Sequence, residues 1–235
     1  MKEIRFFYNA DPHSGELPEE EAAHALRVLR LSVGDEIWIM DGNGTFFRCT
    51  ISECTKKRCL YSILETIPQD RQWKGHLHLA ISPTKNIDRM EWLAEKATEI
   101  GFDELTFLSC RNSERKTVKD ERIEKILISA MKQSHKSGLP KWNGMMDFDT
   151  FITLHAERDV QKFICHCWEG EKVVMKDQIK EGDAIVMIGP EGDFSKDEVE
   201  KAESAGFVAT TLGSSRLRTE TAGLVAINIL HLKNE

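Results

Sequence analysis

Two glycine-containing loops near the end of the chain carry the residues best suited to chemistry. The first is Ile-Gly-Pro-Glu-Gly at 188–192, and the second, at 212–218, includes Arg216 and Arg218. Glycine permits close approach of another group, and proline fixes a turn. Guanidinium groups hold anionic oxygens through charge-assisted hydrogen bonds. One Gly-Pro-Glu-Gly segment alone is also compatible with a tight turn of no further role. A second such loop, with two arginines, favours a ligand site.

The elements that must position these loops are short buried strands. Residues 184–188 form an apolar run without alternation, which is typical of a strand buried on both faces. Residues 207–211 are interpreted as another buried strand. Ser195 and Glu198 have the capping-box spacing, so a helix is expected from there to Ala205. Loops that leave parallel strands for helices are where α/β proteins usually bind small ligands. The sequence therefore predicts that both glycine loops line one site.

The rest of the chain predicts two domains joined by a short linker. Residues 1–70 are rich in expected strands, and residues 76–235 alternate strands and helices. Between them, residues 71–75 end a polar stretch that begins at Pro68 and closes with Gly75, which is typical of a linker. This alternation predicts an α/β domain with a largely parallel sheet. The expected strands are 5–8, 36–41, 46–52, 58–67, 76–82, 103–109, 162–167, 184–188 and 207–211, and the expected helices are 19–30, 88–100, 148–154, 195–205 and 219–232.

Composition indicates an ordinary globular protein. Of the 235 residues 40% are hydrophobic and 30% charged, no apolar run reaches the length of a membrane span, and residues 1–5 do not begin a signal peptide. We therefore expect a cytoplasmic protein. The net charge of −7 argues against nucleic-acid binding by bulk charge, so any RNA contact must be local. The segment 111–141 is the most basic stretch. It is either such a contact or a solvated helix face.

The cysteines predict neither a disulfide framework nor a metal site. Six are present without paired spacing. Cys165 and Cys167 would share one face of a strand with His166 on the other, and no second cluster supplies the remaining ligands of a tetrahedral zinc site. We expect no metal.

The residue string in the two loops resembles the RsmE family. Ile188-Gly189-Pro190-Glu191-Gly192, Leu212-Gly213 and the run Leu217-Arg218-Thr219-Glu220-Thr221-Ala222 carry this resemblance. Further matches are Arg5-Phe6-Phe7, His24, Val28 to Leu31, Val33-Gly34-Asp35, Lys85, Asp88, Glu91-Trp92, Lys96-Ala97 and Glu99-Ile100-Gly101. Members of this family are SPOUT-class methyltransferases that methylate N3 of a uridine in 16S ribosomal RNA.

The resemblance implies a fold, a cofactor and partners. The fold would be a SPOUT-type knotted, largely parallel sheet with helices on both faces, preceded by a small PUA-like β-barrel domain that docks RNA. The cofactor would be S-adenosylmethionine, the partner 16S rRNA, and the protein a homodimer. On the last helix Leu224, Ile227, Leu230 and His231 form a stripe that is either the dimer face or ordinary core.

The resemblance also implies roles for individual residues. Arg218 would stabilise negative charge on uracil, and Glu220 is a candidate proton acceptor or only the first-turn acid of the last helix. The cofactor residues would be Trp168, Glu169, Ile188, Gly189, Pro190, Glu191, Gly192, Leu212, Gly213, Leu217, Thr221 and Ala222. The candidate RNA-binding residues are Arg27, Arg30, Arg111, Arg115, Lys116 and Arg216. His24, Arg27 and Arg30 would share one helix face, which either meets RNA phosphates or is an ordinary solvated face with one satisfied histidine.

One position departs from the family pattern. Family members usually continue Gly-Pro-Glu-Gly with another glycine, whereas this chain has Asp193. If the position needs a positive φ, aspartate tolerates it better than most residues. Its charge would also suit the start of the following helix.

Other function classes fit the sequence less well. A non-catalytic RNA-binding or ribosome-associated protein would use the β domain and the basic segment, and would bind RNA but not S-adenosylmethionine. A phosphate-binding enzyme lacks the Gly-x-x-x-x-Gly-Lys-Ser/Thr pattern, and a serine hydrolase lacks the Gly-x-Ser-x-Gly elbow at Ser214 or Ser215.

Overall fold

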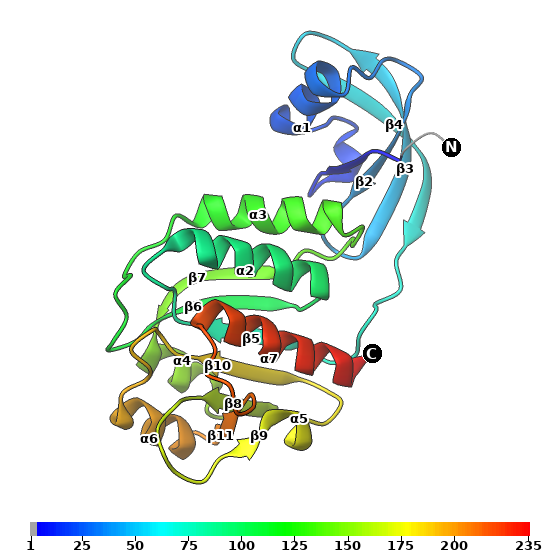
Figure 1. Ribbon diagram of the computed structural model, residues 1–235. Helices are drawn as coiled ribbons and strands as arrows, with labels where there is room; N and C mark the ends of the chain where they lie inside the picture. The colour runs from blue at the N-terminus through cyan, green and yellow to red at the C-terminus, as the bar shows by residue number, and fades with distance from the viewer. Residues whose placement is uncertain (1–3) are drawn as a thin grey trace. The chain divides into compact units, whose positions relative to one another are not determined.

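The computed structural model describes residues 4–235, so residues 1–3 of the N-terminal stretch considered above lie outside it. The chain divides into two compact units. The first extends to Arg71 and includes Ile128–Leu139, and the second comprises Gln72–Leu127 and Pro140–Glu235. Residues 128–139 thus belong to the first unit, although their place in the sequence put them within the expected second domain. Figure 1 shows the elements of both units along the chain.

The first unit is built on a four-stranded sheet in the order β1-β2-β3-β4. Its strands are β1 (Phe6–Tyr8), β2 (Glu36–Met40), β3 (Thr45–Cys54) and β4 (Cys59–Pro68). β1 runs parallel to β2, and the other neighbours are antiparallel, so the expected hairpin at Gly42–Gly44 is present. The outer edge of β4 pairs with the segment around Glu16, through a bridge to Leu60. Phe7, Ile37 and Ile39 lie in its core.

The helical segment of the first unit departs from a regular α-helix. It consists of α1 (Glu19–Ala23) followed by a π-helical turn, η2 (His24–Val28), with the short 3₁₀ helix η1 (Pro12–Ser14) before it. Arg30 lies beyond the helix with φ 56°. The expectation that Arg30 shares a helix face with His24 and Arg27 is therefore wrong, because the 3.6-residue period does not continue to Arg30.

The second unit contains a seven-stranded sheet in the order β7-β6-β5-β10-β8-β11-β9, and its neighbouring strands run parallel. The strands are β5 (Leu77–Ile81), β6 (Glu104–Ser109), β7 (Lys141–Asp147), β8 (Gln161–Cys165), β9 (Val173–Val174), β10 (Ala184–Ile188) and β11 (Val208–Thr211). The helices are α2 (Ile87–Ile100), α4 (Phe148–His155), α5 (Met175–Gln178), α6 (Lys196–Ser204) and α7 (Thr219–Asn234). A further helix, α3 (Asp120–Gln133), begins in this unit, and its residues from Ile128 onward belong to the first unit. The expected parallel α/β sheet is confirmed.

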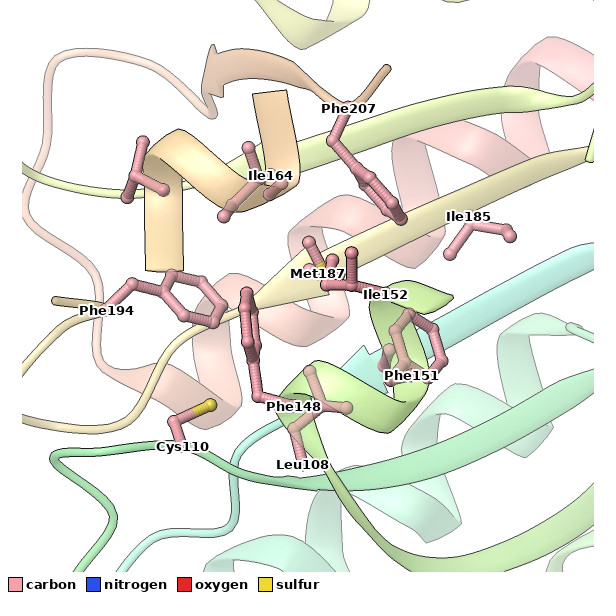
Figure 2. Packing of buried hydrophobic residues seen from close by; sticks show 13 residues of the cluster. Leu108, Cys110, Phe148, Phe151, Ile152, Ile164, Ile185, Met187, Phe194 and Phe207 are labelled. Atoms are coloured by element: carbon pink, nitrogen blue, oxygen red, sulfur yellow. The ribbon is translucent and has the colours of Figure 1, made fainter. Parts of the chain in front are cut away.

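Helices cover both faces of this sheet (Figure 1). Successive residues of each strand point to opposite faces, so neighbouring residues of one strand contact different helices. Ile81 of β5 faces α2 and α7, where a Cβ on Gly223 would stand 2.9 Å from its side chain. Ala80 lies on the other face, in an apolar cluster with side chains from α4 and α6. Figure 2 shows this cluster, in which Phe148, Phe151 and Phe194 pack beside Met187.

The stripe on the last helix is largely core. Ile227, Leu230 and His231 are buried within this single chain, and Leu224 is half-buried. All six cysteines are free thiols, and Cys49, Cys59 and Cys110 are buried. None of the helices in residues 4–235 has the length and apolar content of a membrane span.

Candidate functional site

A cavity of about 590 Å³ lies where β8, β10 and β11 end and α7 begins. Both glycine loops line it, as the sequence predicted. The lining residues are Arg89, Cys165, His166, Cys167, Ile188, Gly189, Pro190, Glu191, Gly192, Asp193, Thr210, Thr211, Leu212, Gly213, Ser215, Arg216, Leu217, Arg218, Thr219, Glu220 and Ala222. Its walls therefore combine apolar side chains with three arginines and three acids.

The first glycine loop is held by close packing. A Cβ on Gly189 would stand 2.9 Å from the ring of Phe194, so only glycine fits there without a shift. The backbone N–H of Asp193 donates to the carbonyl of Pro190 at 2.9 Å, which closes the turn. Asn112 donates its side-chain amide to the carbonyls of Gly192 and Asp193 at 3.3 and 3.0 Å.

Asp193 adopts the left-handed conformation, with φ 64°. This is the condition under which the sequence favoured aspartate at this position. Its carboxylate accepts hydrogen bonds from the backbone N–H of Cys167 at 2.7 Å and of Phe194 at 2.8 Å. The indole N–H of Trp168 donates to the carbonyl of Phe194, also at 2.7 Å. Two hydrogen bonds thus tie the loop after β8 to the loop after β10.

A third contact set joins the first glycine loop to α2 and α7. Arg89, in the first turn of α2, lies 3.7 Å from a carboxylate oxygen of Glu191 and 3.8 Å from one of Glu220. Glu220 is 7% exposed, and its Oε2 has no hydrogen-bond partner within residues 4–235. The backbone N–H of Lys85 donates to Glu191 at 3.1 Å. No sequence pattern indicated Arg89, because its proximity to the two glutamates arises only when α2 packs beside α7.

The second glycine loop is more open. Gly213 has φ 133°, and its N–H donates to the Thr211 hydroxyl, which in turn donates to the Gly213 carbonyl. Arg216 and Arg218 are exposed, and Arg218 is the N-cap residue of α7. The positive end of that helix and two guanidinium groups therefore lie at the same side of the cavity.

Three of the expected cofactor residues do not line this cavity. Trp168 and Glu169 are outside the set, although Trp168 supports the wall through its bond to Phe194, and Thr221 lines a neighbouring hollow instead. The last residue of β8, Cys165, and the loop residues His166 and Cys167 line the cavity, and the sequence predicted all three to form part of a core strand. β8 ends at Cys165, so the expected alternation does not extend to Cys167.

Several expected RNA-binding residues make contacts within the second unit. Arg115 donates to the backbone carbonyls of Thr84 and Lys85 at 3.2 and 2.5 Å, so its guanidinium holds the loop before α2. Lys116 donates to the carbonyl of Cys110 at 3.0 Å, and Arg111 pairs with Asp197 at 3.2 Å on the surface. These contacts leave Arg111 and Lys116 exposed.

No group of three or more His, Cys, Asp or Glu side chains in residues 4–235 is arranged to hold a metal ion. Burial, followed by the nearby Lys172 charge, lowers the pKa of His166, which favours its neutral form. Burial raises the pKa of Cys165 to about 12, so this thiol is a protonated wall residue.

Comparison with known proteins assigns the chain to a family. A family model described as RNA methyltransferase domain matches residues 71–231, and one described as RNA methyltransferase PUA domain matches residues 17–64. A relative from Buchnera aphidicola subsp. Acyrthosiphon pisum, named ribosomal RNA small subunit methyltransferase E, is 30% identical over 91% of this chain and 86% of its own length. The chain belongs to the ribosomal RNA small subunit methyltransferase E family. This is the RsmE family that the loop residues resembled.

Solved structures agree with this RsmE assignment. A Porphyromonas gingivalis protein titled "probable rRNA-methyltransferase" is 40% identical, with a TM-score of 0.92 and 98% of each chain covered. The Neisseria gonorrhoeae ribosomal RNA small subunit methyltransferase E, solved with S-adenosylmethionine bound, is 28% identical, with a TM-score of 0.82 over 96% of this chain and 95% of that one. The predicted combination of a large parallel α/β sheet and a small N-terminal β domain is thereby confirmed.

Proposed function

We propose that this RsmE-family protein transfers a methyl group from S-adenosylmethionine to N3 of a uridine in 16S ribosomal RNA. The observation that carries the proposal is the single cavity that both glycine loops line, with Arg218 and Glu220 at its edge. The alternative, a non-catalytic RNA-binding protein, offers no reason for such a cavity in the second unit.

The cavity fits this cofactor in size and chemistry. Ligand pockets commonly measure about 300–1,000 Å³ with mostly apolar walls and a few polar groups, and this cavity measures about 590 Å³. Ile188, Leu212 and Leu217 supply apolar surface, and backbone groups of the two loops can bind the polar edge of adenine. The start of α7 suits the carboxylate of the cofactor, because a helix N-terminus attracts negative charge. When bound, S-adenosylmethionine supplies an activated methyl group on its sulfonium sulfur.

The residues of the chain would prepare the uracil for reaction. N3 of uridine is protonated at neutral pH, so its attack needs loss of a proton and stabilisation of the resulting charge. Arg218 would donate hydrogen bonds to the uracil oxygens on which that charge develops. Glu220 is the candidate proton acceptor, since Oε2 lacks a partner within the described residues. Arg216 would hold a flanking phosphate.

The first unit would dock the RNA. Its match to an RNA methyltransferase PUA domain supports this role, and Arg27 and Arg30 are candidate phosphate contacts. We keep the functional division into residues 1–70 for docking, 71–75 as a linker and 76–235 for methyl transfer as part of the proposal. Arg111 and Lys116 remain candidate contacts on the second unit. A homodimer, cytoplasmic location and trefoil threading are further expectations from the family.

Calorimetry and methylation mapping would test the proposal together. We expect the purified protein to bind S-adenosylhomocysteine in the micromolar range, and to add one methyl group to 16S rRNA from cells that lack the gene. Mass mapping should place that methyl on a uridine base that resists reagents attacking N3. RNA binding without S-adenosylhomocysteine binding would instead favour the non-catalytic alternative.

A further inference from the structure

A second hollow adjoins the cavity proposed for the cofactor, and no ligand has been assigned to it so far. It measures about 390 Å³ and is lined by Asp88, Arg89, Trp92, Arg218, Glu220 and Thr221. Three of these residues, Arg89, Arg218 and Glu220, also line the cofactor cavity, so the two spaces are contiguous. An acceptor in this hollow would therefore lie beside the cofactor.

Trp92 gives the hollow an aromatic wall. It lies on α2, three residues after Arg89, and 45% of its surface is exposed in this single chain. The ring is therefore accessible to a ligand, and indole faces are stacking platforms for unpaired bases. Its position one helical turn from Arg89 places ring and guanidinium on the same face of α2.

The charges of the hollow suit a neutral heterocycle better than a phosphate. Asp88 and Glu220 balance Arg89 and Arg218, so the formal charge of the lining is zero. A phosphate site would need an excess of positive charge. Arginine side chains instead supply donors for carbonyl oxygens, and the buried carboxylate of Glu220 keeps an oxygen without a partner in residues 4–235.

We propose that this hollow binds the unpaired uracil base, stacked on Trp92, with Arg89 joining Arg218 as a donor to its two carbonyl oxygens. Uracil matches the lining because it is flat, has two acceptors and one N–H donor, and is small enough for the volume. The inference rests on the proposed function, since it names where the acceptor base of that reaction lies. A uridine within a paired stem would have to be flipped out of the stem before it could enter.

The test compares two RNAs on variants of Trp92. One is a 16S fragment carrying the mapped uridine, and the other is the same fragment with an abasic site there. With S-adenosylhomocysteine present, wild-type protein should bind the uridine RNA more tightly than the abasic RNA. Trp92→Ala should reduce that preference about tenfold, which is within the range for loss of one stacked base. Trp92→Phe should retain most of it.

Controls separate the possible failures. Leu154→Ala, which removes an exposed apolar side chain on α4, should leave the preference unchanged. Affinity for S-adenosylhomocysteine should be unchanged in Trp92→Ala. An unchanged uridine preference in Trp92→Ala would overturn the inference. A lower molecular mass of Trp92→Ala than of wild type, measured by light scattering, would also overturn it, because the indole would then lie in an interface between copies. Absence of S-adenosylhomocysteine binding by wild type would count against the proposed function itself.

Discussion

The carboxylate of Asp193 accepts a hydrogen bond from the backbone N–H of Cys167, over 2.7 Å. This bond connects the loops that follow β10 and β8, and both loops line the cavity in which we propose that the cofactor binds. Because a hydrogen bond to a charged acceptor contributes about 1.5–3 kcal/mol, its loss should free one wall of the cavity. Asp193 is thus a positioning residue, acting through the loop it holds.

A graded series at position 193 tests this role. Asparagine keeps an acceptor and tolerates φ 64°, glycine keeps only the conformation, and alanine keeps neither. Affinity for S-adenosylhomocysteine, measured by calorimetry, should fall in the order Asp, Asn, Gly, Ala, with a loss of roughly tenfold for glycine. Asp197→Asn removes an exposed carboxylate nearby and should have no effect. Equal affinity for the Asp193→Gly variant and the wild-type protein would show that the connection does not shape the site.

Gly189 should not accept a side chain. A Cβ there would stand 2.9 Å from the Phe194 ring and 3.1 Å from the Phe194 nitrogen, so Gly189→Ala must displace the loop. We expect about 1–3 kcal/mol of destabilisation in chemical denaturation, together with weaker S-adenosylhomocysteine binding. Gly138→Ala is the matched control, because its Cβ would meet no atom of the described chain within 4 Å. Similar stabilities for the two variants would contradict the packing argument.

Arg218 should affect turnover more than cofactor binding. If its guanidinium stabilises charge on the uracil, Arg218→Ala should lower kcat about 10²–10³-fold, while S-adenosylhomocysteine affinity changes far less. Arg218→Lys should recover part of the rate. Arg216→Ala, in contrast, should raise the KM for RNA with little change in kcat. Steady-state methyl transfer with both substrates varied distinguishes these patterns, and a normal kcat in Arg218→Ala would remove it from the chemistry.

His78 should make the second unit less stable in mild acid. Its burial, opposed by the Glu104 charge and reinforced by those of His155, His76 and Arg158, lowers its pKa from 6.5 to about 3. Below pH 6.5 the His78 imidazole therefore binds a proton in the unfolded chain but stays neutral in the folded chain. The free energy of unfolding consequently falls as the pH drops from 6.5 towards 3. His76 acts in the opposite direction, because its hydrogen bond to Glu104 raises its pKa and favours the folded state below pH 6.5.

A double difference isolates the contribution of His78. His78→Gln keeps a polar group for the Thr106 hydroxyl, which lies 2.8 Å from the imidazole. Whatever the stability of this variant at pH 7, its free energy of unfolding should fall by about 2 kcal/mol less than that of wild type when the pH is lowered from 7 to 5. Urea denaturation at the two pH values measures it. An identical pH dependence in both proteins would mean that His78 does not carry this proton linkage.

Local patterns in the sequence predicted much of the second unit. The strand at Ala184–Ile188 and the capping box of Ser195 and Glu198 have the expected bounds and hydrogen bonds, because each depends on residues adjacent in the chain. The edge strand Lys141–Asp147 was missed. Its half-exposed residues, with Gly144 at positive φ, carry neither an apolar run nor a clean alternation.

The site was predictable where residues are close in sequence and not where packing brings them together. The two glycine loops were expected to meet because loops at the ends of parallel strands share an edge. Arg89 could not be assigned, since α2 lies about one hundred residues earlier in the chain than the loops it joins. Asp193 was noticed as an unusual residue, but its bond to Cys167 depends on the end of a different strand.

The assignment of Ile128–Leu139 to the first unit means that the polypeptide passes between the units more than once. Met131 in this segment is fully buried beside Met40 and Phe46 of the first unit. A fragment that ends at Arg71 would lack residues 128–139, which contribute to the core of the first unit. Met131, in the other fragment, would then be exposed to water. The first unit is consequently not formed by the N-terminal stretch alone, and its exchange between relatives would require both of its segments, the stretch up to Arg71 and residues 128–139.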